Sequence, residues 1–402
     1  MPQFKTLKDF DLKGKTILLR ADLNVPAQHG KVTDTTRIDR LKPTIDYLCE
    51  TGAKILILSH FGRPEGEQNP EMSLVFLTPV LEERWGKHVR FSPDCIGEPA
   101  KKLASSLENG EIGLLENVRF HKEETANDKE FTAKIASLGD IYVNDAFSAS
   151  HRAHASTEGL AHILPSAAGF LMEAELNALQ AALEAPEKPV VAIAGGSKIS
   201  TKLEVLNNLI EKVDYLILGG GMANTFLYAK GANLGDSLYE ANMAEQAREI
   251  MSKAEKLDCE IILPKDSIVV EEIKSNAKYE IVDSKNIPAG KRAIDVGPES
   301  VQHLLEILAK CKTLLWNGPL GVFEIKPFDS GTNELASMAA KLTKEKLLVS
   351  VAGGGDTVAA LENSGHIDDM SYVSTAGGAF LEWLQGKTLP GVAALQENRK
   401  AA

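Results

Sequence analysis

Cysteine is scarce in this sequence, and long apolar runs are absent. The four cysteines are widely spaced, with no CxxC pair and no histidine at zinc-site spacing; they are Cys49, Cys95, Cys259 and Cys311. This pattern argues against a disulfide scaffold and predicts free thiols in a reducing compartment. No stretch is long enough to cross a membrane, and the first residues form no apolar signal region. We therefore expect a cytoplasmic protein without a membrane partner.

Positive charge is also in short supply. The chain has 44 lysines and arginines against 56 aspartates and glutamates, which gives a net charge of -12. Such a balance disfavours nucleic acid as a partner. It leaves room for a small anionic ligand, because screening confines charge effects to roughly 8 Å and a local cluster of arginines then decides.

Familiar nucleotide-binding and catalytic motifs are missing as well. The sequence contains neither the P-loop motif nor GxGxxG, which disfavours a Walker-type ATPase and a standard dinucleotide-binding protein. It shows no arrangement typical of a Ser/His/Asp triad. Its chemistry is therefore expected to depend on other groups.

Short β-rich runs alternate with longer helical patterns along the chain. The predicted strands are Thr16–Arg20, Lys54–Ser59, Ile112–Leu115, Ile141–Val143, Val190–Ala194, Tyr215–Leu218, Glu260–Leu263, Thr313–Trp316 and Leu347–Ala352. The predicted helices are Arg37–Cys49, Leu74–Trp85, Lys129–Leu138, Lys202–Lys212, Ala241–Leu257 and Ser300–Leu308. Strand–helix alternation with almost continuously apolar strands is typical of parallel sheets covered on both faces. We predict an α/β fold of two doubly wound, Rossmann-like domains joined by a helix, with a cleft between them.

The length of 402 residues also favours two domains over one core. Met172–Leu183 is rich in strong helix formers and ends before two prolines, as a connecting helix would. The predicted domains are residues 1–169 and 187–388, with residues 170–186 as helix and hinge. The alternative is an ordinary surface helix within one larger domain.

The two halves differ in residue chemistry. Eight of the eleven arginines precede residue 153, whereas all four runs of adjacent glycines follow residue 190. Arginine binds carboxylates and phosphates with a planar charged fork. Glycine lets backbone N–H groups approach the phosphates of a nucleotide. The first half therefore suits a small anionic substrate and the second a nucleotide, as phosphoryl transfer between two bound partners requires.

Four predicted strands in the first half each end in a polar cluster. Asp22 and Asn24 lie two apart in an extended stretch, so both can face a substrate hydroxyl. The other clusters contain His60 with Gly62 and Arg63, then Arg119, then Arg152. Ligands of open parallel sheets bind outside these strand ends. Each cluster alone is also explained by an Asx-type turn or a surface arginine beside an acid, but four together favour an anion site.

Arg37 stands at a predicted helix start, where the helix dipole disfavours a cation. A ligand anion would explain this position. A solvated helix start is the alternative.

In the second half, two glycine-rich segments follow predicted strands. Gly195-Gly196 precedes Lys198 and Lys202, which share one face if the segment is helical and can then reach one phosphate chain. Two solvated lysines are the alternative. Gly353-Gly354-Gly355 precedes Asp356 and Thr357, which are expected to cap a helix at Val358–Leu361, while Asp356 offers a hard oxygen to Mg²⁺. A glycine-rich turn with an Asp N-cap explains Asp356, but not three glycines in series.

Two further segments are less specific. Trp316 to Glu324 reads as a rigid turn ending in a carboxylate that would accept from ribose hydroxyls, or as a structural loop. Gly377-Gly378 opens a helix, and close helix packing explains its glycines equally well.

The motifs together resemble those of one family. RADLNVP, SHFGRP, ENVRF, VNDAF, SHRAHAS, AIAGGSK, LGGGMANTF, WNGPLGVFE and GGGDT occur in the order typical of phosphoglycerate kinases, over essentially the whole chain, whose size resembles bacterial members. The resemblance implies reversible phosphoryl transfer between 1,3-bisphosphoglycerate and ADP, giving 3-phosphoglycerate and ATP with Mg²⁺. It also implies a monomer that binds only small molecules, and a C-terminal tail, residues 389–402, that returns to the first domain.

The same resemblance assigns roles to residues. Substrate binding is implied for Asp22, Leu23, Asn24, Arg37, His60, Phe61, Gly62, Arg63, Arg119 and Arg152. Nucleotide binding is implied for Lys198, Lys202, Gly219, Gly220, Gly221, Asn317, Glu324, Gly354, Gly355, Asp356 and Thr357. Arg37, Lys198 and Gly354 would act on the transferring group, and Asp356 would hold Mg²⁺.

Two positions depart from the pattern: Phe61 stands where many members have leucine, and Ser148 where glycine is common. They affect only the expected loop geometry. A phosphometabolite sensor that has lost the chemistry is a rival hypothesis, but it is expected to lack Arg37, Lys198 or Asp356, and all three are present. An NAD-dependent oxidoreductase is weakened by the missing GxGxxG.

Overall fold

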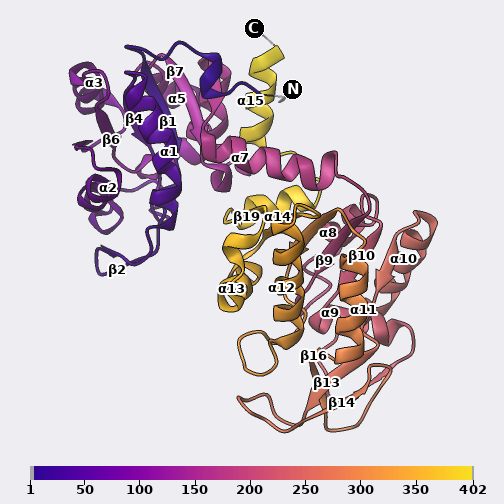
Figure 1. Cartoon of the computed structure of the whole chain (residues 1–402). Helices are drawn as coiled ribbons and strands as arrows, with labels where there is room; N and C mark the ends of the chain where they lie inside the picture. The colour runs from indigo at the N-terminus through magenta and orange to yellow at the C-terminus, as the bar shows by residue number, and fades with distance from the viewer. Residues whose placement is uncertain (1–3, 401–402) are drawn as a thin grey trace. The chain divides into compact units, whose positions relative to one another are not determined.

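The computed structural model describes the backbone of residues 4–400 and the side chains up to residue 397. Contacts divide the described chain into two compact units. Unit 1 contains the residues up to Asn177 together with those from Thr388 onward, and unit 2 contains Ala178–Lys387. Figure 1 shows a sheet with helices in each unit. Within residues 4–400, no helix has the length and apolar character that a membrane span requires.

Unit 1 is built on a six-stranded parallel sheet in the order β5-β6-β4-β1-β7-β8. Its strands are β1 (Thr16–Ala21), β4 (Lys54–Leu58), β5 (Val89–Ser92), β6 (Ile112–Leu115), β7 (Ile141–Asp145) and β8 (Ser166–Ala168). Its helices include α1 (Thr36–Glu50), α2 (Thr78–Trp85), α3 (Gly97–Ser106), α4 (Lys122–Thr125), α5 (Lys129–Ala136), α6 (Leu160–Ile163) and α15 (Pro390–Lys400). Short 3-10 turns η3 (Leu74–Leu77) and η4 (Val118–Phe120) precede α2 and α4.

Side chains along β1 alternate between two hydrophobic cores. Ile17 and Leu19 pack in the core that contains α1 and α2, whereas Leu18 packs in the core that contains α3, α5 and α6. Successive strand residues point to opposite faces of a sheet, so a continuously apolar strand implies that helices cover both faces. This explains why Ile17–Leu19 in β1 and Ile55–Leu58 in β4 are continuously apolar.

The last helix, α15, belongs to unit 1. The Gly391 N–H donates to the Ser150 carbonyl over 2.9 Å, and Ala394 is buried in the core beneath α6. The chain therefore leaves unit 1 once, through α7 (Phe170–Leu179), and returns to it near Thr388.

Unit 2 repeats the architecture with the order β12-β10-β9-β17-β18-β19, again all parallel. Its strands are β9 (Val190–Ala194), β10 (Tyr215–Leu218), β12 (Glu260–Ile262), β17 (Thr313–Asn317), β18 (Val349–Gly353) and β19 (Tyr372–Ser374). Its helices are α8 (Leu203–Leu209), α9 (Gly220–Ala229), α10 (Ala244–Lys256), α11 (Pro298–Leu308), α12 (Ser330–Lys344), α13 (Gly355–Ser364) and α14 (Gly378–Leu384). The two sheets confirm the predicted fold class of two Rossmann-like units.

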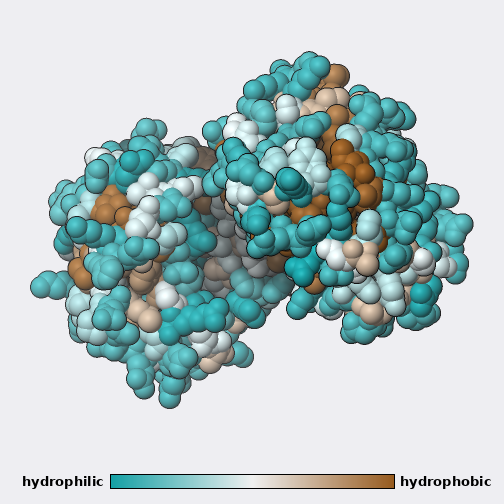
Figure 2. All heavy atoms as spheres, turned by 90° about the horizontal axis from the view of Figure 1, so that it is seen from below, coloured by the Kyte–Doolittle hydropathy of each residue, from teal (hydrophilic) through white to brown (hydrophobic). Residues whose placement is uncertain are grey.

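A second, antiparallel sheet in unit 2 was not predicted. It has the order β14-β13-β16 and consists of β13 (Asp266–Val270), β14 (Tyr279–Asp283) and β16 (Arg292–Val296). Ile281 on β14 and Ile273 before it are exposed. Figure 2, a view from below, shows brown, hydrophobic areas on an otherwise mostly hydrophilic surface. Charged residues interrupt these strands in the sequence, which hid their pattern.

The predicted helix Met172–Leu183 is split in the structure. Regular helix α7 ends at Leu179, and a wider π turn, η7 (Gln180–Glu184), follows. The predicted helix Leu74–Trp85 is likewise the 3-10 turn η3 followed by α2. Periodicity alone does not distinguish 3-10, α and π turns over a few residues.

Candidate active site

The polar clusters predicted in unit 1 meet at one edge of its sheet. Because β1, β4, β6 and β7 are parallel neighbours, their carboxyl ends lie side by side. Asp22 and His60 are largely buried there, with 7% and 8% of their surfaces exposed. Burial of polar side chains at strand ends is typical of a ligand site in a parallel sheet.

Asp22 holds Arg37 in place. The Arg37 guanidinium donates to Asp22 Oδ2 over 2.7 Å and to the Asn24 carbonyl over 2.9 Å. The hydroxyl of Ser148 donates to the same carboxylate oxygen. Asp22 thus partly neutralises Arg37 at the start of α1. This pairing explains how a cation is tolerated at a helix start, where the helix dipole disfavours it. A third of its side chain stays exposed and available to a ligand.

Asn24 and Asn117 order the loop that follows β4. The side chain of Asn24 accepts from the Gly62 N–H over 3.0 Å, and Asn117 Nδ2 donates to the Phe61 carbonyl over 2.7 Å. The Phe61 ring turns away and packs edge-on against Phe76. The Leu23 side chain is fully buried in the core, so only its backbone lies at the site.

Arg20 is a site residue that the sequence analysis did not single out. Only 1% of it is exposed, and its guanidinium contacts His60 Nδ1 at 3.0 Å and Ser156 Oγ at 2.8 Å. Ser156 in turn donates to Glu124 over 2.6 Å, which places a carboxylate behind the arginine. An arginine inside an otherwise apolar strand was the available signal, since buried arginines are rare without a partner.

Two histidines share this cationic region. Burial lowers the pKa of His60 well below its ordinary value, and Arg20, Arg119 and Arg37 add to the effect. Burial and the same kind of charge repulsion from Arg119 lower the pKa of His154 to about 4. Both rings are therefore neutral near pH 7. Because Arg20 donates to Nδ1 of His60, the proton of the neutral His60 ring lies on Nε2.

Arg119 has a buried guanidinium nitrogen, Nε, that makes no hydrogen bond within the described residues. Its side chain donates to the Gly62 carbonyl over 3.1 Å. Burial and the neighbouring Arg20 lower its pKa. A buried, unpaired guanidinium nitrogen is costly unless a ligand satisfies it. Arg63 and Arg152 are exposed and act electrostatically on Arg119 and His154 respectively.

In unit 2, the loops that follow the strands pack closely through their backbones, with glycine at the contact points. A Cβ added at Gly195 would lie 1.8 Å from the Pro319 carbonyl oxygen, and one at Gly219 would lie 2.7 Å from Leu320 Cα. The loops after β9, β10 and β17 therefore pack main chain against main chain. Gly318 adopts φ +113, a conformation that other residues rarely take.

Lys202 is placed differently from the prediction. The segment after Gly196 is not helical, and α8 begins only at Leu203, so Lys198 and Lys202 do not share a helix face. Lys202 Nζ turns inward and donates to Asn317 Oδ1 over 2.7 Å and to the Gly195 carbonyl over 2.8 Å. Burial lowers its pKa to about 8, opposed by the charge of Asp356. Lys198 is exposed.

The predicted caps at α13 are also wrong. The helix begins at Gly355 rather than Val358, with Gly354 as N-cap at φ +98. Asp356 thus lies in the first turn, exposed, where the helix dipole favours a carboxylate. Thr357 Oγ1 accepts from the Gly318 N–H over 2.7 Å and links α13 to the loop after β17.

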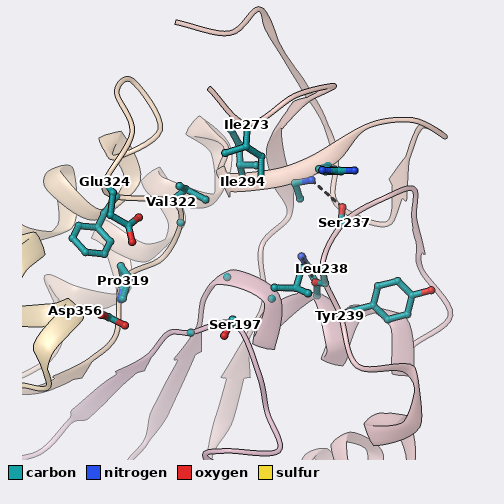
Figure 3. A pocket seen from close by; sticks show the side chains of 18 of the residues that line it. Ser197, Ser237, Leu238, Tyr239, Ile273, Ile294, Pro319, Val322, Glu324 and Asp356 are labelled. Atoms are coloured by element: carbon teal, nitrogen blue, oxygen red, sulfur yellow. Dashed lines mark hydrogen bonds between the residues drawn. The ribbon is translucent and has the colours of Figure 1, made fainter. Parts of the chain in front are cut away.

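A cavity of about 670 Å³ opens beside these loops. In Figure 3, Ser197 and Asp356 mark its glycine-rich polar side, while Ile273 and Ile294 lie at the opposite side and Glu324 lies beside Pro319 and Val322. Ala293 N–H donates to Ser237 Oγ over 2.8 Å in its wall. The cavity is lined by Gly196, Ser197, Gly220, Gly221, Asn224, Asp236, Ser237, Leu238, Tyr239, Ile273, Arg292, Ala293, Ile294, Pro319, Gly321, Val322, Phe323, Glu324 and Asp356.

The cavity contains only part of the predicted nucleotide set. Gly220, Gly221, Glu324 and Asp356 line it, whereas Asn317 is buried and does not. Its apolar wall comes from segments that the sequence analysis did not flag, above all Leu238, Ile273 and Ile294. These residues belong to loops and to the unpredicted β14-β13-β16 sheet, and no local motif marks them.

A profile of the phosphoglycerate kinase family matches residues 7–387. The chain belongs to the phosphoglycerate kinase family. It is 57% identical to the phosphoglycerate kinase of Rhodospirillum centenum over 98% of this chain and 99% of that protein. It is 56% identical to that of Cereibacter sphaeroides with the same coverage. The structure of phosphoglycerate kinase from Coxiella burnetii matches with a TM-score of 0.92 and 42% identity, over 98% of this chain and 99% of that one.

Family membership establishes the enzyme class. The chain is a kinase of glycolysis that acts on the 1-carboxyl group of 3-phosphoglycerate, with ATP or ADP and Mg²⁺ as the nucleotide substrate of the family. Small molecules are therefore its substrates.

Proposed function

We propose that unit 1 binds 3-phosphoglycerate or 1,3-bisphosphoglycerate and that unit 2 binds the magnesium nucleotide. The observation that carries this division is the unpaired, buried Arg119 Nε among cationic side chains in unit 1. Such a site suits a ligand with several negative charges. The cavity of unit 2, with an apolar side and a glycine-rich side, suits a base and its phosphates.

In unit 1, Arg119, Arg63 and Arg152 would bind the substrate's phosphate and carboxylate, with Gly62 and Phe61 contributing backbone. His60 would donate from Nε2 without adding charge, because Arg20 occupies its Nδ1. Asp22 and Asn24 would accept from the glycerate hydroxyl, with the Leu23 backbone between them. Asp22 already accepts from Arg37 and Ser148, so a substrate hydroxyl would join or replace these bonds.

In unit 2, the adenine ring would lie against Leu238, Ile273 and Ile294, and Glu324 would accept from ribose hydroxyls. The phosphates would extend toward Gly196, Gly220 and Gly221 on the polar side of the cavity. Gly219 and Asn317 would support these loops without lining the cavity. The backbone of Gly354, Gly355 and Thr357 at the start of α13 would complete the phosphate site.

Asp356 is suited to coordinate Mg²⁺ through its carboxylate. Its carboxylate is exposed at the cavity, and hard oxygen donors together with phosphate oxygens are what Mg²⁺ prefers. The ion would arrive with the nucleotide and neutralise phosphate charge. Lys202 Nζ already donates three hydrogen bonds, to the Gly195 carbonyl, the Asn317 carbonyl and Asn317 Oδ1, so it would reach the phosphates only after giving up one of them.

The transfer itself needs cations in place rather than a protein nucleophile. Arg37 and Lys198, both at least partly exposed, would stabilise the charge on the transferring group, and the Gly354 N–H would donate to it. No covalent enzyme intermediate is required.

Direct transfer brings the reacting atoms within about 3–3.5 Å, so we infer that the two liganded units close on each other during turnover. Residues 170–186, including the α7–η7 segment, would act as the hinge between domains 1–169 and 187–388. Small-angle scattering tests this inference: the two ligands together should reduce the radius of gyration more than either alone. An unchanged value in the ternary complex, with an extended free enzyme, would rule out closure.

We further propose a cytoplasmic monomer that binds no nucleic acid, on the grounds of its negative charge and free thiols. Light scattering coupled to size exclusion measures the mass, and a dimer at micromolar concentration would contradict the proposal.

The decisive assay couples ATP and 3-phosphoglycerate to the appearance of an acyl phosphate. The full chain should turn over with both substrates and magnesium, and should show no turnover with NAD. Binding of both ligands without turnover would instead support a sensor. Titration calorimetry with each ligand on variants of one unit then tests the division of sites.

A further inference from the structure

We propose that Asp94, Cys95 and His121 of unit 1 form a binding site for a borderline-soft divalent cation such as Zn²⁺. The ligand atoms of the three side chains lie within 4.8 Å of one another. Asp94 and Cys95 follow β5, whereas His121 follows η4, so the fold brings together residues that the sequence separates. This site is distinct from the residues proposed for phosphoryl transfer.

The three donor atoms lie near enough to one another to contact a single ion after small shifts. His121 Nε2 lies 2.8 Å from Asp94 Oδ1. Zinc–ligand bonds of about 2.0–2.3 Å place tetrahedral neighbours roughly 3.3–3.7 Å apart, so shifts of about 1 Å would seat the ion. The His121 and Asp94 side chains are 24% and 31% exposed, which leaves a route for the ion and a position for a water ligand.

The surroundings hold the three donors in place. The Ile96 N–H donates to Asp94 Oδ1 over 3.2 Å, and the His121 ring packs against Phe131 with centroids 5.1 Å apart. Burial raises the pKa of the Cys95 thiol well above its ordinary value, and the nearby carboxylates of Asp94, Glu124 and Glu116 raise it further. A cation at this point would therefore meet a negative environment.

An ion pair between His121 and Asp94 that merely ties two loops together is the plainer interpretation. It accounts for those two side chains, but it does not explain why a thiol lies within 4.8 Å of both. Mixed N, S and O donors favour Zn²⁺ or Co²⁺ over Mg²⁺. On binding, the S–H bond of Cys95 breaks, a sulfur–metal bond forms and the proton passes to solvent, with no change of oxidation state.

Cobalt titration of the full, chelator-treated chain tests the site. One equivalent of Co²⁺ should produce sulfur-to-cobalt charge-transfer absorption, and Zn²⁺ should abolish it while excess Mg²⁺ should not. Cys95→Ser should remove the absorption. Cys311→Ser, which alters another buried thiol in unit 2, should retain it.

A second variant guards against misfolding of Cys95→Ser. His121→Gln should weaken Zn²⁺ binding at least about 10-fold to 100-fold in competition with a chromophoric chelator, with circular dichroism confirming the fold. Absent absorption in the wild type, or unchanged binding in either variant, would overturn the proposal. Since the probe is the metal alone, this result is independent of the coupled kinase assay.

Discussion

The two units have the same sheet architecture, but the loops at the edges of their sheets are built from different groups. Unit 1 presents side chains, with Arg20, Arg37 and Arg119 converging at the ends of β1, β4 and β6. Unit 2 presents backbone, with loops so close at Gly195 and Gly219 that a side chain cannot fit. The sheet thus decides where a ligand binds, and the residue types decide how.

The difference has a cost in each unit. Unit 1 must balance its cations when no ligand is present, and it does so with Asp22 at Arg37 and with Glu124 behind Arg20. Unit 2 must instead keep side chains out of the positions at Gly195 and Gly219 where its loops pack closely. Variants should therefore damage unit 1 through electrostatics and unit 2 through packing.

Removing one cation from unit 1 should have the largest effect. Arg37→Ala should lower kcat about 100-fold to 1,000-fold, or roughly 3–4 kcal/mol, because its charge acts mainly on the transition state. Steady-state kinetics with both substrates measure this. Arg84→Ala removes an exposed arginine paired with Asp39 and should leave kcat unchanged. A kcat for Arg37→Ala within roughly threefold of wild type would contradict the role.

Adding one methyl group to unit 2 should come next. Gly195→Ala places a Cβ 1.8 Å from the Pro319 carbonyl oxygen and should lower the free energy of unfolding by about 1–3 kcal/mol. Urea denaturation and hydrogen exchange of unit 2 amides report it. At Gly355 a Cβ would meet nothing within 4 Å in the described part of the chain, so Gly355→Ala should cause no loss. Equal losses in both variants would refute the packing argument.

Removing the carboxylate at α13 should separate the two ligands. Asp356→Ala should weaken MgADP binding about tenfold, or ~1.4 kcal/mol, and leave 3-phosphoglycerate binding nearly intact. Titration calorimetry with each ligand measures both affinities. Glu362→Ala, an exposed carboxylate on the same helix, should change neither. Equal weakening of both ligands would break the division between units.

The smallest expected effect concerns protons. Burial and Arg119 lower the pKa of His154 to about 4, below the 6.5 of an exposed histidine. Between pH 6.5 and pH 4 the unfolded chain binds a proton at His154 and the folded chain does not. The free energy of unfolding therefore decreases as the pH falls below 6.5. From pH 7 to pH 5 the loss is about 1 kcal/mol once solvent screening is allowed for.

His154→Asn should flatten that pH dependence, as measured by the free energy of unfolding at both pH values. His29→Asn, at an exposed site, should not. Asp295 in unit 2 should give a pH dependence of the opposite sign. Burial raises its pKa to about 7, so its protonation stabilises the folded state as the pH falls through 7. An equal slope in wild type and His154→Asn would show that His154 is not responsible.

The parallel sheets were predictable because their strands are apolar on both faces. Ile112–Leu115, Val190–Ala194 and Tyr215–Leu218 appear with the predicted limits. The β14-β13-β16 sheet was missed, since β14 is exposed along most of its length and its sequence Tyr-Glu-Ile-Val-Asp is short and mixed. Helix α12 was also not predicted, although its buried face is regular.

Site residues were predictable where a charged or polar side chain stands at the end of a strand or the start of a helix. Arg119 and His60 were found because they follow strands, and Arg37 because it stands at a helix start. Arg20 and His154 were not singled out. The cavity wall of Leu238, Ile273 and Ile294 left no signal, because apolar residues in loops look the same whether they line a cavity or fill a core.

The sequence by itself determined the fold class, the family, and the separation of arginine-rich from glycine-rich halves, because these depend on residue types in order along the chain. Only the tertiary structure decided that Asp22 holds Arg37, that Lys202 turns inward to Asn317, and that Cys95 meets His121. These pairings join residues from 15 to 115 positions apart. Their geometry is set by how strands and loops pack, and local sequence does not encode it.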